Sequence, residues 1–167
     1  MQTTGSQDPR QASLGSEFAG RGLSVGVAES LTGGLLASRF ARAEGASTWF
    51  RGGIVAYNPD VKREVLRTGP GPVVTRKTVL EMARGVARLL TADLSVAVSG
   101  VGGPDPQDGV PPGTVWIAVV VGSREVAELH NFDGDPDEVC SATCDAAVAL
   151  ALRVAREWQP DPATPPQ

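Results

Sequence analysis

The sequence has few of the residues that bind metals or form disulfide frameworks. It contains two cysteines and one histidine in 167 residues. Cys140 and Cys144 are four positions apart in a predicted helix, with no CxxC spacing. Zinc sites use four Cys, His or carboxylate ligands at characteristic spacings, so a metal centre or redox pair is disfavoured. We therefore expect no metal and no cofactor, and two small packed side chains on one helix face.

Positive charge and long apolar runs are also scarce. The net charge is −4, and the arginines are scattered rather than clustered. Nucleic-acid binding depends on clustered Lys and Arg, so a nucleic-acid partner is disfavoured. No apolar run approaches the roughly 20 residues of a membrane-spanning helix, and the first residues do not resemble a secretory signal. We expect a cytoplasmic protein with no membrane partner.

What is present is the composition of one globular domain. Hydrophobic residues make up 41% of the chain, and its length suits a single domain with a substantial core. Residues 1–10 are polar and residues 159–167 are rich in proline, so both segments are predicted to be disordered. The domain is therefore predicted to span residues 11–158.

Helices and strands alternate in the first part of the chain, and a hairpin follows. Patterning predicts helices at about residues 12–19, 32–43, 75–90 and 135–158, with another after Asn58, an N-cap followed by proline. It predicts strands at 23–28, 53–57 and 94–100, and a hairpin formed by 114–121 and 125–132. This order favours an α/β fold, specifically a three-layer α/β/α sandwich with a mixed sheet.

Polar residues follow the first predicted strand, where α/β proteins commonly bind ligands. The stretch "AESLTGG" contains Glu29, Ser30 and Thr32 before Gly33 and Gly34. Glycines near a helix start let a ligand approach the backbone, and the free N–H groups there favour an anion such as phosphate. The alternative is that Ser30 or Thr32 only caps the helix. The two interpretations remain open on this stretch alone.

A second glycine-rich stretch follows the third predicted strand. Gly100, Gly102 and Gly103 begin like a dinucleotide-binding GxGxxG motif, but Pro104 and Pro106 stand where a helix should open. A Rossmann oxidoreductase is therefore disfavoured. The stretch is either a glycine-lined binding loop or a surface connection.

Lys62 lies about one turn inside the helix that Asn58 would cap. The positive end of a helix disfavours a cation there, and burial would lower the pKa of the lysine further. A neutral lysine can act as general base for a serine nucleophile. The candidate serines are Ser30, Ser47 and Ser99. We expect Lys62 Nζ within hydrogen-bond reach of Ser47 or Ser30; the alternative is an exposed lysine paired with Asp60 or Glu64.

Four stretches occur together in one order: "VAESLTGGLLASRF", "EGASTWFRGGIVAYNPDVK", "VAVSGVGGPD" and "PPGTVWIAV". Through them the chain resembles the C-terminal domain of the CinA (competence/damage-inducible protein) family, and thus the PncC-type nicotinamide mononucleotide amidohydrolases. The resemblance covers roughly residues 12–158. It implies the three-layer fold and hydrolysis of the substrate's carboxamide to nicotinate mononucleotide and ammonia, a step in pyridine nucleotide salvage.

The resemblance also implies roles for individual residues. A Ser/Lys pair would act without metal, with Lys62 as base, Tyr57 beside it, and Ser47 as nucleophile, Ser30 being the close second choice. The residues expected to bind substrate lie in the same motifs: Glu29, Thr32, Gly33, Gly34, Ser99, Gly100, Gly102, Gly103 and Thr114.

The chain departs from the family pattern where arginines are expected. The "GDPDEVCSAT" stretch carries Pro136 and Cys140 at those positions, and Val110 replaces a further basic residue. Losing a charge-assisted hydrogen bond costs about 1.5–3 kcal/mol. A catalytically weakened nucleotide-binding or interaction module is therefore the alternative function. Homo-oligomerisation, which would add groups to the site, is left open.

Overall fold

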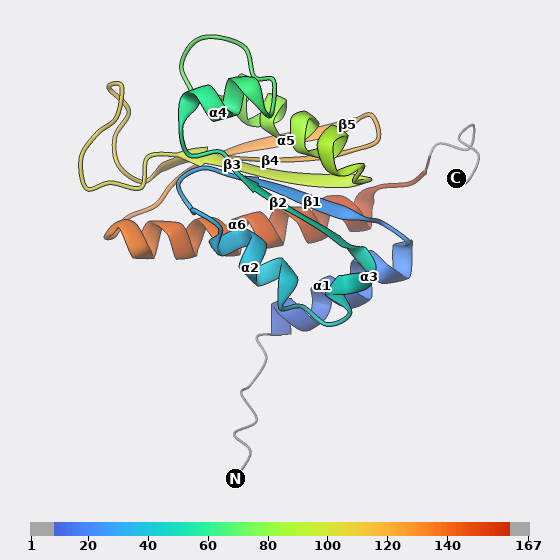
Figure 1. The fold of residues 1–167 in the computed structure, drawn as a ribbon. Helices are drawn as coiled ribbons and strands as arrows, with labels where there is room; N and C mark the ends of the chain where they lie inside the picture. The colour runs from blue at the N-terminus through green and yellow to red at the C-terminus, as the bar shows by residue number, and fades with distance from the viewer. Residues whose placement is uncertain (1–8, 161–167) are drawn as a thin grey trace.

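The structure is a computed structural model that describes residues 9–160 (Figure 1). Five strands form one sheet in the order β2-β1-β3-β4-β5. The first three are parallel, whereas β4 and β5 add antiparallel, so the sheet is mixed. The strands are β1 (Val25–Glu29), β2 (Phe50–Val55), β3 (Leu94–Gly100), β4 (Thr114–Val121) and β5 (Arg124–Asn131).

Helices cover both faces of this sheet. On one face lie α1 (Pro9–Arg21), α2 (Leu35–Ala41), α3 (Ala46–Trp49) and α6 (Pro136–Glu157). On the other lie α4 (Pro59–Glu64) and α5 (Arg76–Leu90) (Figure 1). The three-layer α/β/α architecture predicted from the order of elements is confirmed.

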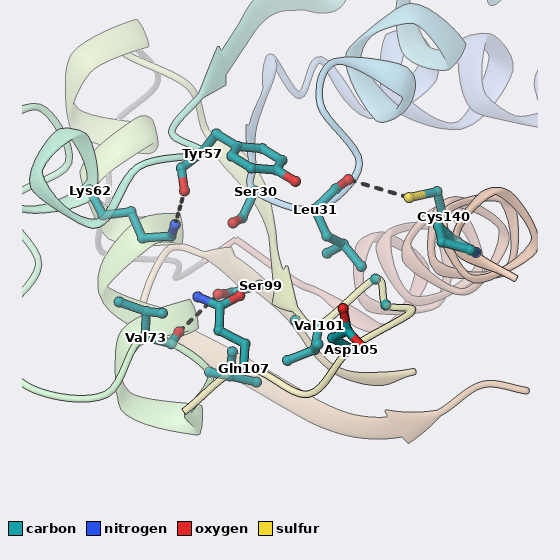
Figure 2. A pocket seen from close by; sticks show the side chains of 15 residues that line it. Ser30, Leu31, Tyr57, Lys62, Val73, Ser99, Val101, Asp105, Gln107 and Cys140 are labelled. Carbon is teal, nitrogen blue, oxygen red and sulfur yellow. Dashed lines mark hydrogen bonds between the residues drawn. The ribbon is translucent and has the colours of Figure 1, made fainter. Parts of the chain in front are cut away.

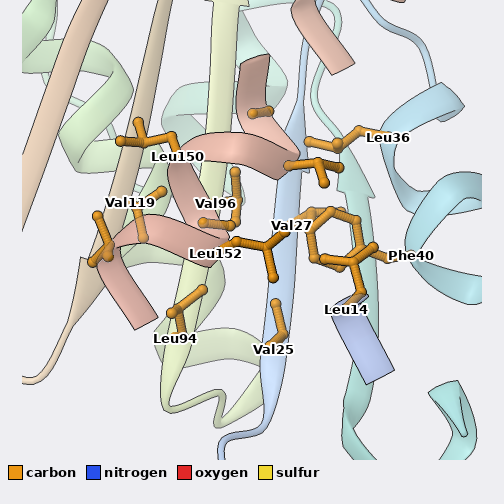
Figure 3. Close-up of a cluster of buried hydrophobic side chains, with 14 of the residues drawn as sticks. Leu14, Val25, Val27, Leu36, Phe40, Leu94, Val96, Val119, Leu150 and Leu152 are labelled. Atoms are coloured by element: carbon orange, nitrogen blue, oxygen red, sulfur yellow. The ribbon is translucent and has the colours of Figure 1, made fainter. Parts of the chain in front are cut away.

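The core divides into two layers because successive strand residues point to opposite faces. Val27 of β1 and Val96 of β3 face α6, where they pack with Leu150 and Phe40 (Figure 3). Neighbouring alanines, such as Ala28, face α5 instead. Central strands covered on both faces carry almost uninterrupted apolar residues. Polar residues at the ends of these strands therefore stand out.

Local capping signals place the two helices nearest the site. The side chain of Asn58 accepts a hydrogen bond from the Asp60 N–H at 2.8 Å, and Pro59 opens α4. Asp135 caps α6 in a capping box with Glu138. Both starts agree with the helix signals in the sequence.

Several predicted boundaries were wrong. The first helix begins at Pro9, so Pro9 and Arg10 belong to a helix rather than to a disordered extension. The second helix begins at Leu35, because the preceding turn needs left-handed glycines. The second strand begins at Phe50, where pairing with β1 starts, and the short α3 was not foreseen. The remaining predicted disorder, in residues 1–8 and 161–167, lies outside the described residues.

No helix within residues 9–160 is long and apolar enough to cross a membrane.

Candidate active site

A cavity of about 200 Å³ opens at the carboxyl ends of the three parallel strands (Figure 2). Its walls come from the segments that follow β1, β2 and β3, from the segment before α5, and from the first turns of α6. The lining residues are Ser30, Leu31, Tyr57, Lys62, Val73, Val74, Ser99, Gly100, Val101, Gly102, Gly103, Asp105, Gln107, Pro136 and Cys140. This is the edge at which open α/β sheets bind ligands.

Lys62 is buried on α4, with 1% of its surface exposed. Its Nζ donates a hydrogen bond to the Tyr57 carbonyl oxygen at 3.0 Å. Asp60, a carboxylate considered as its partner, pairs instead with Arg63 at 2.8 Å. The alternative of an exposed, ion-paired lysine is therefore wrong.

Burial changes the acid–base chemistry of this lysine. Removal of the ammonium from water lowers the pKa of Lys62 from 10.5 to about 8. With that pKa, roughly a tenth of the lysine is neutral at pH 7 and half at pH 8. A buried amine in this range can take a proton from a nearby hydroxyl and give it back.

Ser30 lines the same cavity from the loop after β1. It is 8% exposed, and within residues 9–160 its hydroxyl has no hydrogen-bond partner. Figure 2 shows it between the Tyr57 ring and the Lys62 side chain. The expected direct hydrogen bond from Lys62 to a serine is absent among the described residues, where Nζ donates to the Tyr57 carbonyl instead. Catalytic hydrogen bonds of this kind often tighten only in the substrate complex.

Ser47 is not brought to Lys62. It is exposed in α3, immediately before the start of β2, whereas Lys62 follows the other end of that strand. Six strand residues at about 3.3 Å each separate the two ends by roughly 20 Å. Ser47 also does not line the cavity. The preferred pairing of Ser47 with Lys62 is therefore wrong within one chain, and Ser30 is the serine that shares a cavity with the lysine.

Glu29 is a structural residue rather than a substrate ligand. Its fully buried carboxylate accepts hydrogen bonds from the Thr32 hydroxyl at 2.6 Å and from the N–H groups of Leu36, Ala37 and Gly34 at 2.8, 3.0 and 3.2 Å. The positive end of α2 therefore already holds the protein's own carboxylate. The predicted phosphate site at Thr32–Gly34 is wrong for this reason.

Gly33 and Gly34 shape the turn instead of binding a ligand. Both have left-handed backbones, with φ of 55° and 107°. Neither lines the cavity. The Gly33 N–H donates to the Ser30 carbonyl at 3.1 Å, which fixes the backbone beside the Ser30 hydroxyl. The two glycines thus position Ser30 indirectly.

The glycine loop after β3 does line the cavity, through Gly100, Gly102 and Gly103. A Cβ at Gly100 would lie 2.6 Å from the Thr114 carbonyl oxygen, so only glycine fits this approach of β4. Thr114 itself lies outside the cavity, and its hydroxyl pairs with Asn131 at 3.4 Å.

The Ser99 hydroxyl donates to the Val73 carbonyl at 2.8 Å, so it holds the segment before α5 in place.

Besides Leu31 and Val101, which lie inside the quoted motifs, four lining residues were missed by the sequence analysis. Asp105 and Gln107 follow the glycine run, and Val73 and Val74 precede α5. The position of Asp105 and Gln107 directly after a parallel strand was a usable signal. The two valines reach the cavity only through tertiary packing, and no pattern marks them.

Cys140 faces the cavity from α6, and its thiol donates to the Leu31 carbonyl at 3.3 Å. Burial, and then the negative charges of Asp137 and Glu29, raise the pKa of the thiol. The thiolate is the nucleophilic form, so this cysteine is unsuited to attack a substrate. Among residues 9–160, no group of three or more His, Cys, Asp or Glu side chains could hold a metal ion.

Residues 7–155 of the chain match the family model of the CinA C-terminal domain. The chain belongs to this family. A putative competence-damage inducible protein of Desulforudis audaxviator is 40% identical over 147 residues, which are 84% of this chain and 35% of that protein. A CinA-like protein of Frankia casuarinae is 37% identical over 139 residues, or 80% of this chain and 32% of that protein. The chain thus spans about a third of these curated relatives.

Solved structures agree with this CinA assignment. The competence damage-inducible protein A of Klebsiella pneumoniae superposes with a TM-score of 0.87 at 30% identity, covering 90% of this chain and 98% of that one. A CinA superfamily protein of Escherichia coli gives 0.85 at 29% identity, covering 92% and 93%. In both pairs the similarity covers at least 90% of each chain.

Proposed function

We propose that this CinA-family protein is a serine amidohydrolase that converts nicotinamide mononucleotide to nicotinate mononucleotide and ammonia. One observation carries the proposal: a buried lysine with a pKa of about 8 and an unpartnered serine hydroxyl line the same small cavity. The resemblance to PncC-type enzymes supplies the substrate.

The mechanism is acyl transfer. The Ser30 hydroxyl attacks the carboxamide carbon, and neutral Lys62 takes the hydroxyl proton. The protonated lysine then returns this proton to the departing nitrogen, which leaves as ammonia. Water, deprotonated by the same lysine, hydrolyses the acyl-serine and releases the carboxylic acid. Ser30 and Lys62 are restored at the end of the cycle.

Backbone groups assist these two side chains. The Tyr57 carbonyl anchors Nζ at the cavity. Tyr57 as a whole is 69% exposed, and its ring lies near Ser30 in Figure 2. The N–H groups of Gly102 and Gly103 have no hydrogen-bond partner within residues 9–160. They are the candidate donors to the oxyanion that forms when serine attacks.

The test is ammonia release from nicotinamide mononucleotide by the purified protein. Ser30→Ala and Lys62→Ala should each abolish release, whereas Ser47→Ala, the same change at an exposed serine outside the cavity, should leave it unchanged. Full activity in Ser30→Ala would refute the mechanism. Loss in Ser47→Ala, with Ser30→Ala active, would mean that a second copy supplies the nucleophile.

A second candidate function is a nucleotide-binding module without catalysis. One observation favours it: Nζ donates to the Tyr57 carbonyl rather than to Ser30. Nucleotide binding measured by calorimetry, with no ammonia released, would identify this function.

A further inference from the structure

The cavity has almost nothing with which to hold a phosphate group. Among its lining residues Lys62 is the only lysine or arginine, and its ammonium is buried against the Tyr57 carbonyl. The one carboxylate among the lining residues is that of Asp105. Phosphate recognition normally uses arginine pairs, lysines or free helix N-termini.

Two helix starts beside the cavity, those of α2 and α6, already hold carboxylates of the protein. Glu29 takes the first N–H groups of α2. At α6, the Asp135 carboxylate accepts from the Glu138 N–H at 2.9 Å, and Pro136 has no N–H to offer. The first turn of α6 also carries Asp137. Both helix starts therefore already carry negative charge.

Two arginines on the helices around the cavity are paired with carboxylates. Arg39 binds Asp145 and the Ser141 hydroxyl, between α2 and α6. Arg63 binds Asp60, as described above, and neither arginine lines the cavity. The charges of Asp137 and Glu29 act on the Cys140 thiol in the same wall, where they raise its pKa. The carboxylates of Asp137 and Glu29 are therefore the charges that act on this part of the wall.

We propose that this site recognises the carboxamide on a cationic pyridinium ring and does not recognise the phosphate, so that nicotinamide riboside is at least as good a substrate as the mononucleotide. This rests on the proposed amidohydrolase function. Asp105 and the acidic turn of α6 attract the pyridinium cation, but they repel a phosphate that carries about two negative charges at pH 8. The cavity of about 200 Å³ is also below the roughly 300–1,000 Å³ of pockets that enclose larger ligands.

The test compares kcat/KM for the two substrates, which differ only in the phosphate. The expected ratio, nucleoside over mononucleotide, is one or higher. A tenfold or greater preference for the mononucleotide would overturn the proposal.

Two variants make the comparison specific. Asp105→Asn should move the ratio toward the mononucleotide, and Pro136→Arg should do so by about tenfold, since it adds a cation to a lining position. Asp108→Asn is the matched control, because it removes the same charge from the same loop at an exposed position outside the cavity. It should leave the ratio unchanged. A shift as large in Asp108→Asn as in Asp105→Asn would contradict the role of the cavity wall.

Binding measured by calorimetry tests whether the site recognises phosphate separately from whether the protein is an amidohydrolase. If neither compound is hydrolysed, the proposed function fails, but equal or tighter binding of the nucleoside still supports a site that ignores phosphate. Mononucleotide binding that is tenfold tighter, or no binding of either compound, overturns the proposal.

Discussion

Two buried charged side chains, those of Glu29 and Lys62, lie beside the same cavity, and they differ in how many hydrogen-bond partners they have. Glu29, fully buried, accepts hydrogen bonds from four groups, whereas Lys62, 1% exposed, donates one to a carbonyl. A buried charge with its full set of partners stabilises the structure that surrounds it. A buried charge with few partners has its pKa shifted and becomes available for chemistry. The difference separates the scaffold of this site from its reactive group.

The largest expected effect is the loss of activity in Lys62→Met. The substitution keeps the volume of the side chain but removes the base, so ammonia release should fall by about 10²–10⁴-fold. The melting temperature at pH 7 should be equal or higher, because a poorly compensated buried ammonium is removed. Ammonia release and thermal unfolding of the same preparation check both statements. Activity within tenfold of the unmodified protein would remove Lys62 from the mechanism.

Glu29→Gln should destabilise the protein by about 2–3 kcal/mol. The amide group presents N–H donors to backbone N–H groups that need acceptors, so at least one buried donor is left unpaired. Urea unfolding measures the change in the free energy of unfolding. Glu44→Gln, the same change at an exposed glutamate, is the control and should have no effect. Unchanged stability with lost substrate binding would make Glu29 a ligand after all.

The lowered pKa of Lys62 should make both the activity and the free energy of unfolding depend on pH. The activity should rise with pH along a limb with an apparent pKa near 8, since only neutral Lys62 accepts a proton. Between pH 8 and 10.5 the unfolded chain holds a proton on this lysine that the folded protein has lost. The free energy of unfolding should therefore rise with pH in this window, by about 2 kcal/mol relative to Lys62→Met. Parallel stability curves for the two proteins would contradict this assignment.

The smallest effect is expected at Gly34. Its N–H is the most distant of the four donors to Glu29, at 3.2 Å, and its φ is 107°. Gly34→Ala should destabilise the protein by about 1–2 kcal/mol, because alanine is strained there. Gly20→Ala in α1, where a Cβ would meet nothing within 4 Å, should instead be neutral or stabilising by roughly 0.5–1 kcal/mol. Urea unfolding of both variants gives the comparison, and equal effects would refute the strain at Gly34.

Sequence patterns correctly predicted the features that depend on a few neighbouring residues, such as helix starts and amphipathic helices. Asn58 and Pro59 predicted the start of α4 correctly, and the amphipathic stripe at residues 75–90 predicted α5. The interpretation of Lys62 as a lysine that burial could deprotonate also survives. The predicted phosphate site failed because Glu29 reaches the start of α2 from the last residue of β1. The spacing of residues in the sequence does not reveal such a hydrogen bond, because Glu29 and Leu36 are seven positions apart and lie in different elements.

The sequence by itself determined the layers of this protein and its family, because the period of apolar residues and the helix caps act over a few neighbouring positions. Only the tertiary structure decided which serine meets the lysine. Parallel pairing of β1 with β2 brings their carboxyl ends, with Ser30 and Lys62, to one edge of the sheet and leaves Ser47 at the other end of β2. Strand direction in a sheet follows from contacts between distant segments, and no single stretch of sequence contains it.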